Sequence, residues 1–426
     1  MRIRIQSQCL SVVFLVAATS QFAMAQPTSR SSATPRIDVQ EFLSSGKLEL
    51  AERTLTDAVK ADPTDDQTRL GLGLVQMVRG IERLMQGLHR YGLRTQASNG
   101  MLAMATGGLP PLPIPPNPAP EEISYDQFRA IFQTWVTDLG TVDATLSKLS
   151  NNDVKLAVQI GLVRMDFDGD GQATEEESLW RVYQRLNREA DISLDDVKKV
   201  IVGFDRADAE WLRGYCNLLM ALGDFFLAYD AHELFERTAH MLFPRVKTPH
   251  DFLKARGSEF GEFRDIVDLI GFVHLINFPV KEPARLKSAL EHLQAMTARS
   301  RSMFKLVLAE TDDDNEWIPS PKQTGIIPDM KITAEMIQGW MEFLDEADAL
   351  LAGKKLIPFW RGDDANRGVN LHKFFTEPQP FDLVMWIQGT AATPYLERGS
   401  VTKSETWERL DRIFQGQFVG IAFWLN

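Results

Sequence analysis

Apolar positions along the chain recur mainly at intervals of three and four residues, which is the spacing of an amphipathic helix. The clearest stretches span residues 128–139, 211–229, 286–296 and 340–351. The second stretch is apolar on so many sides that we expect most of it to be buried. Asp205 and Thr333 are the residue types that cap helix N-termini, and they stand before the second and fourth stretches.

Alternation of the kind found in β-strands is scarce in this sequence. Only residues 325–331 and 381–386 show it, and only briefly. Residues 154–165 (VKLAVQIGLVRM) and 175–186 have amphipathic patterns that predict two further helices. We therefore expect an all-α, mostly helical fold.

The first 25 residues have the pattern of a cleavable signal peptide. Two arginines precede a short apolar run, and alanines occupy the two spaced positions that end it. A buried N-terminal helix is the alternative. Since no later stretch approaches 18 uninterrupted apolar residues, we expect no transmembrane segment. The protein is then exported, to the periplasm or the extracellular space.

Two polar or proline-rich stretches predict the domain organisation. Residues 26–36 (QPTSRSSATPR) predict a flexible spacer. Residues 107–120 contain seven prolines, so they cannot continue a helix and predict an extended linker. This linker would separate a helical region at 37–106 from a larger helical domain at 121–426. A rigid loop inside one domain is the alternative.

Composition and charge exclude several classes of protein. The chain has 44% hydrophobic and 24% charged residues, which is typical of a globular protein. Lys and Arg number 46 against 58 for Asp and Glu, a net charge of −12. Such an acidic surface repels phosphate backbones, so we expect no nucleic-acid partner and a preference for cations. Without the leader, Cys216 is the lone cysteine, which excludes an intrachain disulfide.

Small and apolar residues between positions 37 and 95 follow a repeat-like spacing. The positions that match are Phe42, Gly46, Ala51, Leu55, Ala58 and Pro63. This segment resembles the second half of a tetratricopeptide repeat (TPR), and the resemblance implies a surface that binds a protein partner. The pattern departs from the family in the next repeat, and an ordinary helical hairpin is the alternative.

Residues Asp166 to Glu177 (DFDGDGQATEEE) form an acidic segment with oxygen-bearing side chains at regular spacing. The segment resembles the EF-hand calcium loop over its whole length. The resemblance implies a single EF-hand at about 151–188 that binds Ca²⁺. Gly171 stands at the sixth position, where the family's loop turns sharply. The implied ligands are the carboxylates of Asp166, Asp168 and Asp170, the main-chain carbonyl of Gln172, Thr174 directly or through water, and both oxygens of Glu177.

Two departures from the EF-hand pattern limit the expected function. Ala173 stands where the family places a branched apolar residue that pairs with a second loop, and the apolar positions after the loop, Leu179, Val182, Tyr183 and Leu186, are offset by one from the family's pattern. No second complete loop exists nearby. We therefore expect a calcium ion that stabilises the fold rather than a paired sensor.

A second polar segment, Trp360 to His372, suggests a different chemistry. Asp363 or Asp364 with His372 could form an acid–base pair in a pocket. A solvated loop with Arg–Asp ion pairs is the alternative.

The favoured function is an exported calcium-binding protein, a calcium-stabilised helical scaffold for protein–protein interaction. The second hypothesis is an enzyme of unassigned class that uses this polar segment. The sequence leaves the oligomeric state open.

Overall fold

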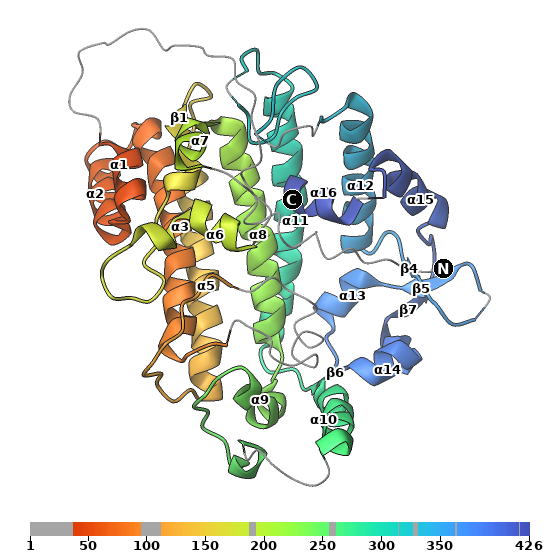
Figure 1. Cartoon of the computed structure of the whole chain (residues 1–426). Helices are drawn as coiled ribbons and strands as arrows, with labels where there is room; N and C mark the ends of the chain where they lie inside the picture. Colours follow the sequence, from red (N-terminus) through yellow and green to blue (C-terminus); the bar gives the residue numbers. More distant parts are fainter. Residues whose placement is uncertain are drawn as a thin grey trace, which may run out of the picture.

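Helices dominate the computed structural model of the chain, which confirms the expected all-α class (Figure 1). The structure describes residues 37–94, 112–186, 193–254, 261–313, 315–326, 331–362, 364–416 and 418–426. The predicted leader, the spacer and the first part of the proline-rich segment lie outside these residues.

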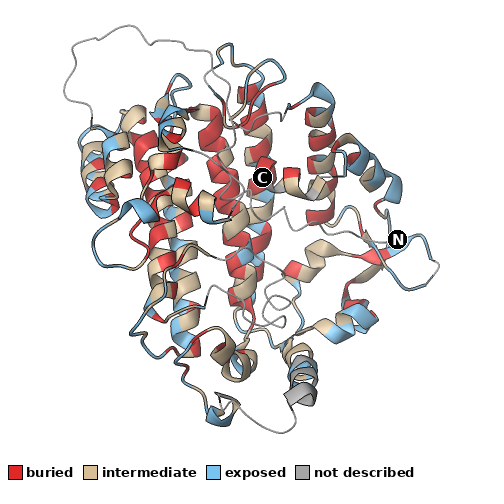
Figure 2. Cartoon of the chain, viewed as in Figure 1, coloured by how far each residue is buried: buried red, intermediate tan, exposed pale blue. Residues whose placement is uncertain are grey.

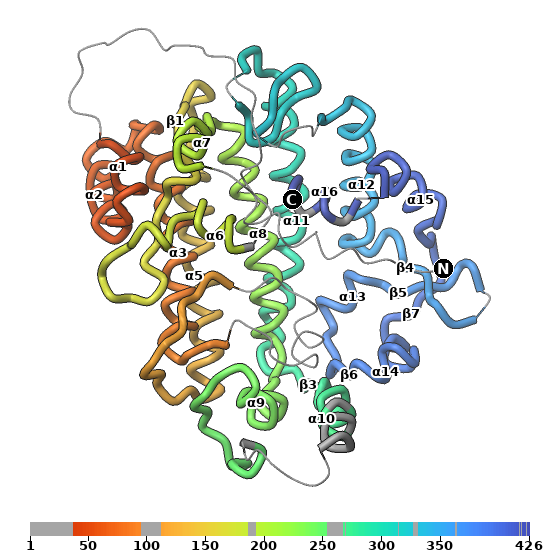
Figure 3. The backbone as a smooth tube through the Cα atoms, viewed as in Figure 1, coloured from red at the N-terminus to blue at the C-terminus, as the bar shows by residue number. Residues whose placement is uncertain are grey.

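Four long helices lie side by side and form the centre of the molecule (Figure 3). They are α3 (Asp66–Arg90), α5 (Tyr125–Leu146), α8 (Arg206–Ala228) and α11 (Pro283–Val307). Their buried residues lie toward the centre of the molecule, whereas exposed positions are frequent on the outer helices and on the loops (Figure 2). The predicted helices at 128–139, 211–229 and 286–296 are thereby confirmed, apart from Tyr229, which caps α8.

The predicted helix at 340–351 is α12 (Ala334–Leu351), which packs against α11. Thr333 caps this helix by accepting a hydrogen bond from the Met336 N–H at 3.1 Å. Asp205 caps α8 in the same way and forms a reciprocal capping box with Asp208. Both N-caps expected from the sequence are confirmed.

The shorter elements surround this centre. Helices α1 (Val39–Ser45) and α2 (Leu48–Ala61) pack on α3. The other α-helices are α6 (Leu179–Leu186), α7 (Leu194–Lys199), α9 (His232–Thr238), α10 (Gly261–Leu275), α13 (Leu371–Thr376), α14 (Leu383–Gln388), α15 (Ser404–Ile413) and α16 (Phe418–Leu425). The 3₁₀ turns are η2 (Ile160–Leu162), η3 (Glu175–Glu177), η4 (Ala239–Met241), η5 (Asp251–Lys254) and η6 (Thr390–Tyr395).

The strands are short and pair antiparallel. They are β1 (Leu156–Val158) with β2 (Val202–Phe204), β3 (Asn277–Phe278) with β6 (Phe381–Asp382), and β5 (Arg367–Val369) between β4 (Ile357–Pro358) and β7 (Leu396–Arg398). Within 381–386, only the first two residues are strand, and α14 follows.

The prediction of a helix at 154–165 is wrong. The segment forms β1 and then the turn η2. Val154 and Val158 are buried, whereas Ala157 is exposed. Backbone pairing with β2, a partner almost fifty residues away, therefore outweighed the local helical pattern. The acidic loop is consequently preceded by a strand and a turn, not by a helix.

Helices on both sides of the proline-rich segment share one apolar core. Leu70 of α3, Leu139 of α5 and Leu212 of α8 belong to the same buried cluster. Within residues 112–120, Ile114 is buried beside α3. The Glu121 N–H donates to the carbonyl of Arg90 at 3.0 Å, at the end of α3. The second part of the segment therefore packs onto the body of the protein.

Across the part of the chain that the structure describes, no helix combines the length and the apolar character needed to cross a membrane.

Candidate functional site

Hydrogen bonds between flanking residues close the base of the acidic loop. The Met165 N–H donates to the Glu177 carbonyl at 3.3 Å, and the Leu179 N–H donates to the Val163 carbonyl at 2.9 Å. The two ends of the loop are therefore held side by side, and the residues between them must turn back sharply.

The first aspartate organises this turn. The Asp166 carboxylate accepts hydrogen bonds from the main-chain N–H groups of Gly169 at 2.7 Å and Gly171 at 2.9 Å. Both glycines have positive φ angles, 76° and 86°, which a residue with a side chain adopts only with strain. Gly171 thus has the backbone conformation expected for the sixth position of the loop.

The last glutamate closes the loop from the other side. One oxygen of Glu177 accepts from the Phe167 N–H at 2.8 Å, and the other accepts from the N–H and the hydroxyl of Thr174 at 2.9 and 2.8 Å. Asp166 and Glu177 are each only 8% exposed. One oxygen from each of Asp166, Asp168 and Glu177 lies within 4.8 Å of the others. Three carboxylates in this space repel one another unless a cation lies between them.

The structure places the other predicted ligands on the same loop, but not in this group of three carboxylates. Asp170 is exposed, and its carboxylate accepts from the Gln172 N–H at 2.7 Å. Gln172 and Thr174 are also exposed. Hard oxygen ligands of these kinds suit a divalent cation such as Ca²⁺, which takes six to eight of them.

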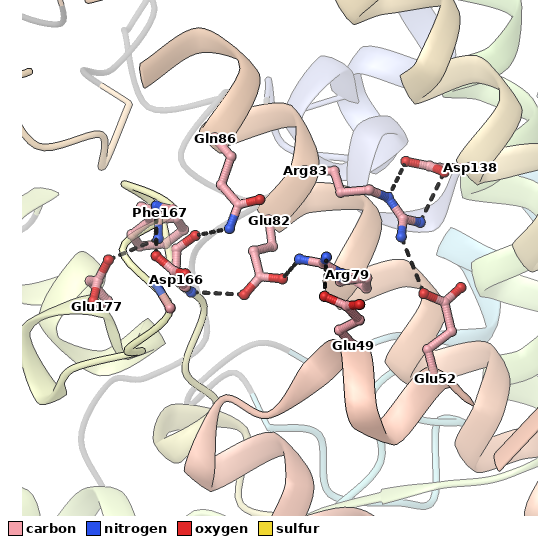
Figure 4. A network of polar contacts seen from close by, with 12 residues as sticks. Glu49, Glu52, Arg79, Glu82, Arg83, Gln86, Asp138, Asp166, Phe167 and Glu177 are labelled. Carbon is pink, nitrogen blue, oxygen red and sulfur yellow. Dashed lines mark hydrogen bonds and ion pairs between the residues drawn. The ribbon is translucent and has the colours of Figure 1, made fainter. Parts of the chain in front are cut away.

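Side chains of α3 hold the loop from outside (Figure 4). Glu82 accepts from the Asp166 N–H at 2.8 Å, and the Gln86 side chain donates to the Asp166 carbonyl at 2.7 Å. Glu82 is 2% exposed, and burial raises its pKa above the ordinary range even though its hydrogen bond with Asp166 and its ion pair with Arg79 act in the opposite direction. Sequence reasoning missed Glu82 and Gln86, because nothing local relates α3 to a loop some eighty residues later.

The same face of α3 is tied to its neighbouring helices by ion pairs. Arg79 contacts Glu82 and, at 3.4 Å, Glu49 of α2. Arg83 forms two hydrogen bonds of 2.9 Å with Asp138 of α5 and an ion pair of 3.1 Å with α2 (Figure 4). The polar contacts that hold the loop therefore continue into the packing of α2, α3 and α5.

The turn between α1 and α2 touches the loop directly. Gly46 ends α1 with φ 67°, and a Cβ atom at this position would lie 2.1 Å from the Cβ of Ala173. The Arg164 N–H donates to the carbonyl of Leu43 in α1 at 2.9 Å. Ala173, which departs from the EF-hand pattern, is therefore the small residue that this close contact requires.

A second group of carboxylates lies at the N-terminus of α8. Oxygens of Asp205, Glu310 and Glu316 lie within 4.8 Å of one another, and Asp208 is close by. Burial, reinforced by the charge of Asp205, raises the pKa of Glu310 to about 7. Burial and the same neighbouring charge raise the pKa of Asp208 well above its ordinary range. Sequence patterns do not predict this group, since its members come from two distant segments.

The residues of the predicted acid–base pair are engaged elsewhere. Nδ1 of His372 lies 2.9 Å from the Leu351 carbonyl, and Asp364 forms an ion pair of 2.8 Å with Arg398. Asp363 lies outside the described residues. The structure therefore does not bring His372 and Asp364 together as a catalytic pair.

Comparison with known proteins finds no match for this chain among protein-family models, curated proteins or solved structures.

Proposed function

We propose that this protein binds one calcium ion in the loop Asp166–Glu177. The ligands would be the carboxylates of Asp166, Asp168, Asp170 and Glu177, the Gln172 carbonyl and Thr174. The observation that carries the proposal is the convergence of the Asp166, Asp168 and Glu177 oxygens in a loop whose turn is made by glycines with positive φ angles. Among the described residues, no cationic side chain forms an ion pair with these three carboxylates, so a bound cation would balance their charge.

The ion would act as a structural brace. The loop contacts α1 through Ala173 and Gly46, and α3 through Glu82 and Gln86. An ion that fixes the loop therefore also fixes the N-terminal helices to the rest of the chain. Export to the periplasm or the extracellular space, which the N-terminal pattern predicts, would expose the loop to abundant calcium.

The calcium-stabilised helical fold would serve as a scaffold for a protein partner. Support comes from an apolar surface on α10 and α14, two helices that pack on each other. Val267, Ile270 and Ile387 are 62%, 64% and 67% exposed, and Val384 and Met385 lie beside Ile387 on α14. Exposed apolar side chains gathered on two helices that contact each other are typical of protein interaction sites.

Calcium titration of the full mature chain tests the metal site. After metal removal, calcium should bind in calorimetry and raise the melting temperature. Glu177→Gln should weaken binding roughly 100-fold, because the side chain loses the charge that clamps the ion from both oxygens. Glu176→Gln is the matched control, since Glu176 is an exposed neighbour on the same turn. Absence of binding heat at millimolar calcium would disprove the proposal.

Capture of exported proteins by the immobilised chain tests the scaffold. We expect a partner to be retained in calcium and lost with a chelator or with Ile387→Asp. The exposed Leu222→Asp is a control at a surface position on another helix, α8. Retention that is equal in all four cases would contradict the scaffold role while leaving the metal site intact.

A further inference from the structure

A pocket of about 170 Å³ lies between α3 and α8. Its aliphatic wall comes from α3 and from residues on both sides of the acidic loop. Its aromatic wall comes from α8, β2 and the C-terminal part of the chain, through Phe204, Trp211, Tyr215, Trp317 and Trp424. An apolar cavity of about 150 Å³ in another protein stays dry and binds benzene. The present pocket is therefore large enough for one substituted aromatic ring.

Two tryptophans of the aromatic wall have unused hydrogen-bond donors. The indole N–H groups of Trp317 and Trp424 are buried and have no hydrogen-bond partner in the described part of the chain. Trp424 itself is only 4% exposed. A buried donor without an acceptor destabilises a protein by about 1–3 kcal/mol. A ligand oxygen that reaches these donors would remove this penalty.

Asp208 and Tyr215 also line the pocket. Asp208 is 6% exposed, and burial together with the charge of Asp205 raises its pKa well above the ordinary range. Burial raises the pKa of Tyr215 to about 12, so its hydroxyl keeps its proton at neutral pH. The charges of Glu310 and Glu316 also act on Asp208 and raise its pKa further.

We infer that this pocket binds an uncharged, apolar small molecule of about one ring, with an oxygen that accepts hydrogen bonds from the wall. The apolar lining selects the body of the ligand, and the indole donors select its oxygen. An anion would be repelled by the carboxylates at the N-terminus of α8. A cationic ligand without an acceptor oxygen would leave both indole donors unmatched. The inference does not depend on calcium binding.

Isothermal titration of the full mature chain with three probes of one shape tests the inference. Acetophenone carries the oxygen, ethylbenzene lacks it, and 1-phenylethylammonium carries a positive charge. We expect acetophenone to bind at least about 5-fold more tightly than either of the other two, the effect of one hydrogen bond. Failure of acetophenone to bind at millimolar concentration, equal binding of acetophenone and ethylbenzene, or tighter binding of the ammonium probe would overturn the inference.

Trp424→Phe removes one donor and keeps an aromatic wall. It should reduce the preference for acetophenone over ethylbenzene at least about 3-fold. Trp180→Phe is the matched control, because Trp180 also has a buried indole N–H without a partner in the described chain but does not line the pocket. If Trp424→Phe does not fold, Trp317→Phe makes the same test. An unchanged preference in the folded variant, or an equal loss in the control, would overturn the assignment.

Discussion

Two groups of carboxylates in this protein are built from the same residue types and behave differently. In the loop, Asp166 and Glu177 receive hydrogen bonds from several main-chain N–H groups. In the group at the N-terminus of α8, Glu310 receives one from the Gln323 side chain at 3.1 Å, and burial raises its pKa to about 7.

The difference lies in how the acids are brought together. A tight loop with glycines directs main-chain N–H groups and carboxylates toward one region. Where distant segments bring acids together, burial disfavours the charged form and raises the pKa, as it does for Glu310. We therefore expect the two groups to differ in their effect on stability when the packing of the loop is disturbed, when calcium is added and when the pH changes.

The largest effect should come from disturbing how the loop is docked. Gly46→Ala places a side chain on a residue with left-handed backbone conformation and brings its Cβ against Ala173. We expect this change to lower the free energy of unfolding by about 3 kcal/mol. Gly416→Ala is the matched control, since Gly416 also has a positive φ, 77°, but no atom lies within 4 Å of its Cβ position. Urea denaturation measures both variants. Equal losses would show that the close contact with Ala173 is unimportant.

A smaller effect separates the two groups by their metal response. Calcium at 100 times its dissociation constant should stabilise the wild type by about 2.7 kcal/mol. Asp168→Asn should lose most of this gain, whereas Asp205→Asn should keep it, because Asn can still cap α8. Melting curves with calcium and with chelator give the answer. If only Asp205→Asn lost the stabilisation by calcium, the ion would bind to the carboxylates at the N-terminus of α8 and not to the loop.

The smallest effect concerns pH. The pKa of Glu310 is raised from 4.5 to about 7 in the folded protein. Between these values the folded state holds a proton that the unfolded state has released. The contribution of Glu310 to the free energy of unfolding is therefore most favourable below about pH 4.5 and is lost as pH rises to about 7. Glu310→Gln cannot titrate and should be more stable than the wild type by roughly 1 kcal/mol at pH 8.

Denaturation at pH 5 and pH 8 measures this change, with the exposed Glu408→Gln as control. A wild type and a Glu310→Gln variant with the same pH dependence would show that the carboxylates at α8 ionise independently.

Local patterns predicted the parts of the fold in which sequence neighbours decide the structure. The helices α5, α8, α11 and α12 follow their apolar periodicity, and the caps Asp205 and Thr333 act on N–H groups within one turn. The helix expected at 154–165 failed, because its segment pairs with β2, which the sequence does not place beside it.

The twelve residues of the acidic loop by themselves determine which oxygens can converge, because spacing and glycine geometry act within one short turn. Tertiary structure alone decided what surrounds them: Gly46 against Ala173, Glu82 and Gln86 on the Asp166 backbone, and the carboxylates gathered at the start of α8. Contacts of this kind join segments many residues apart, and they form only when the long helices pack and remove water from between them.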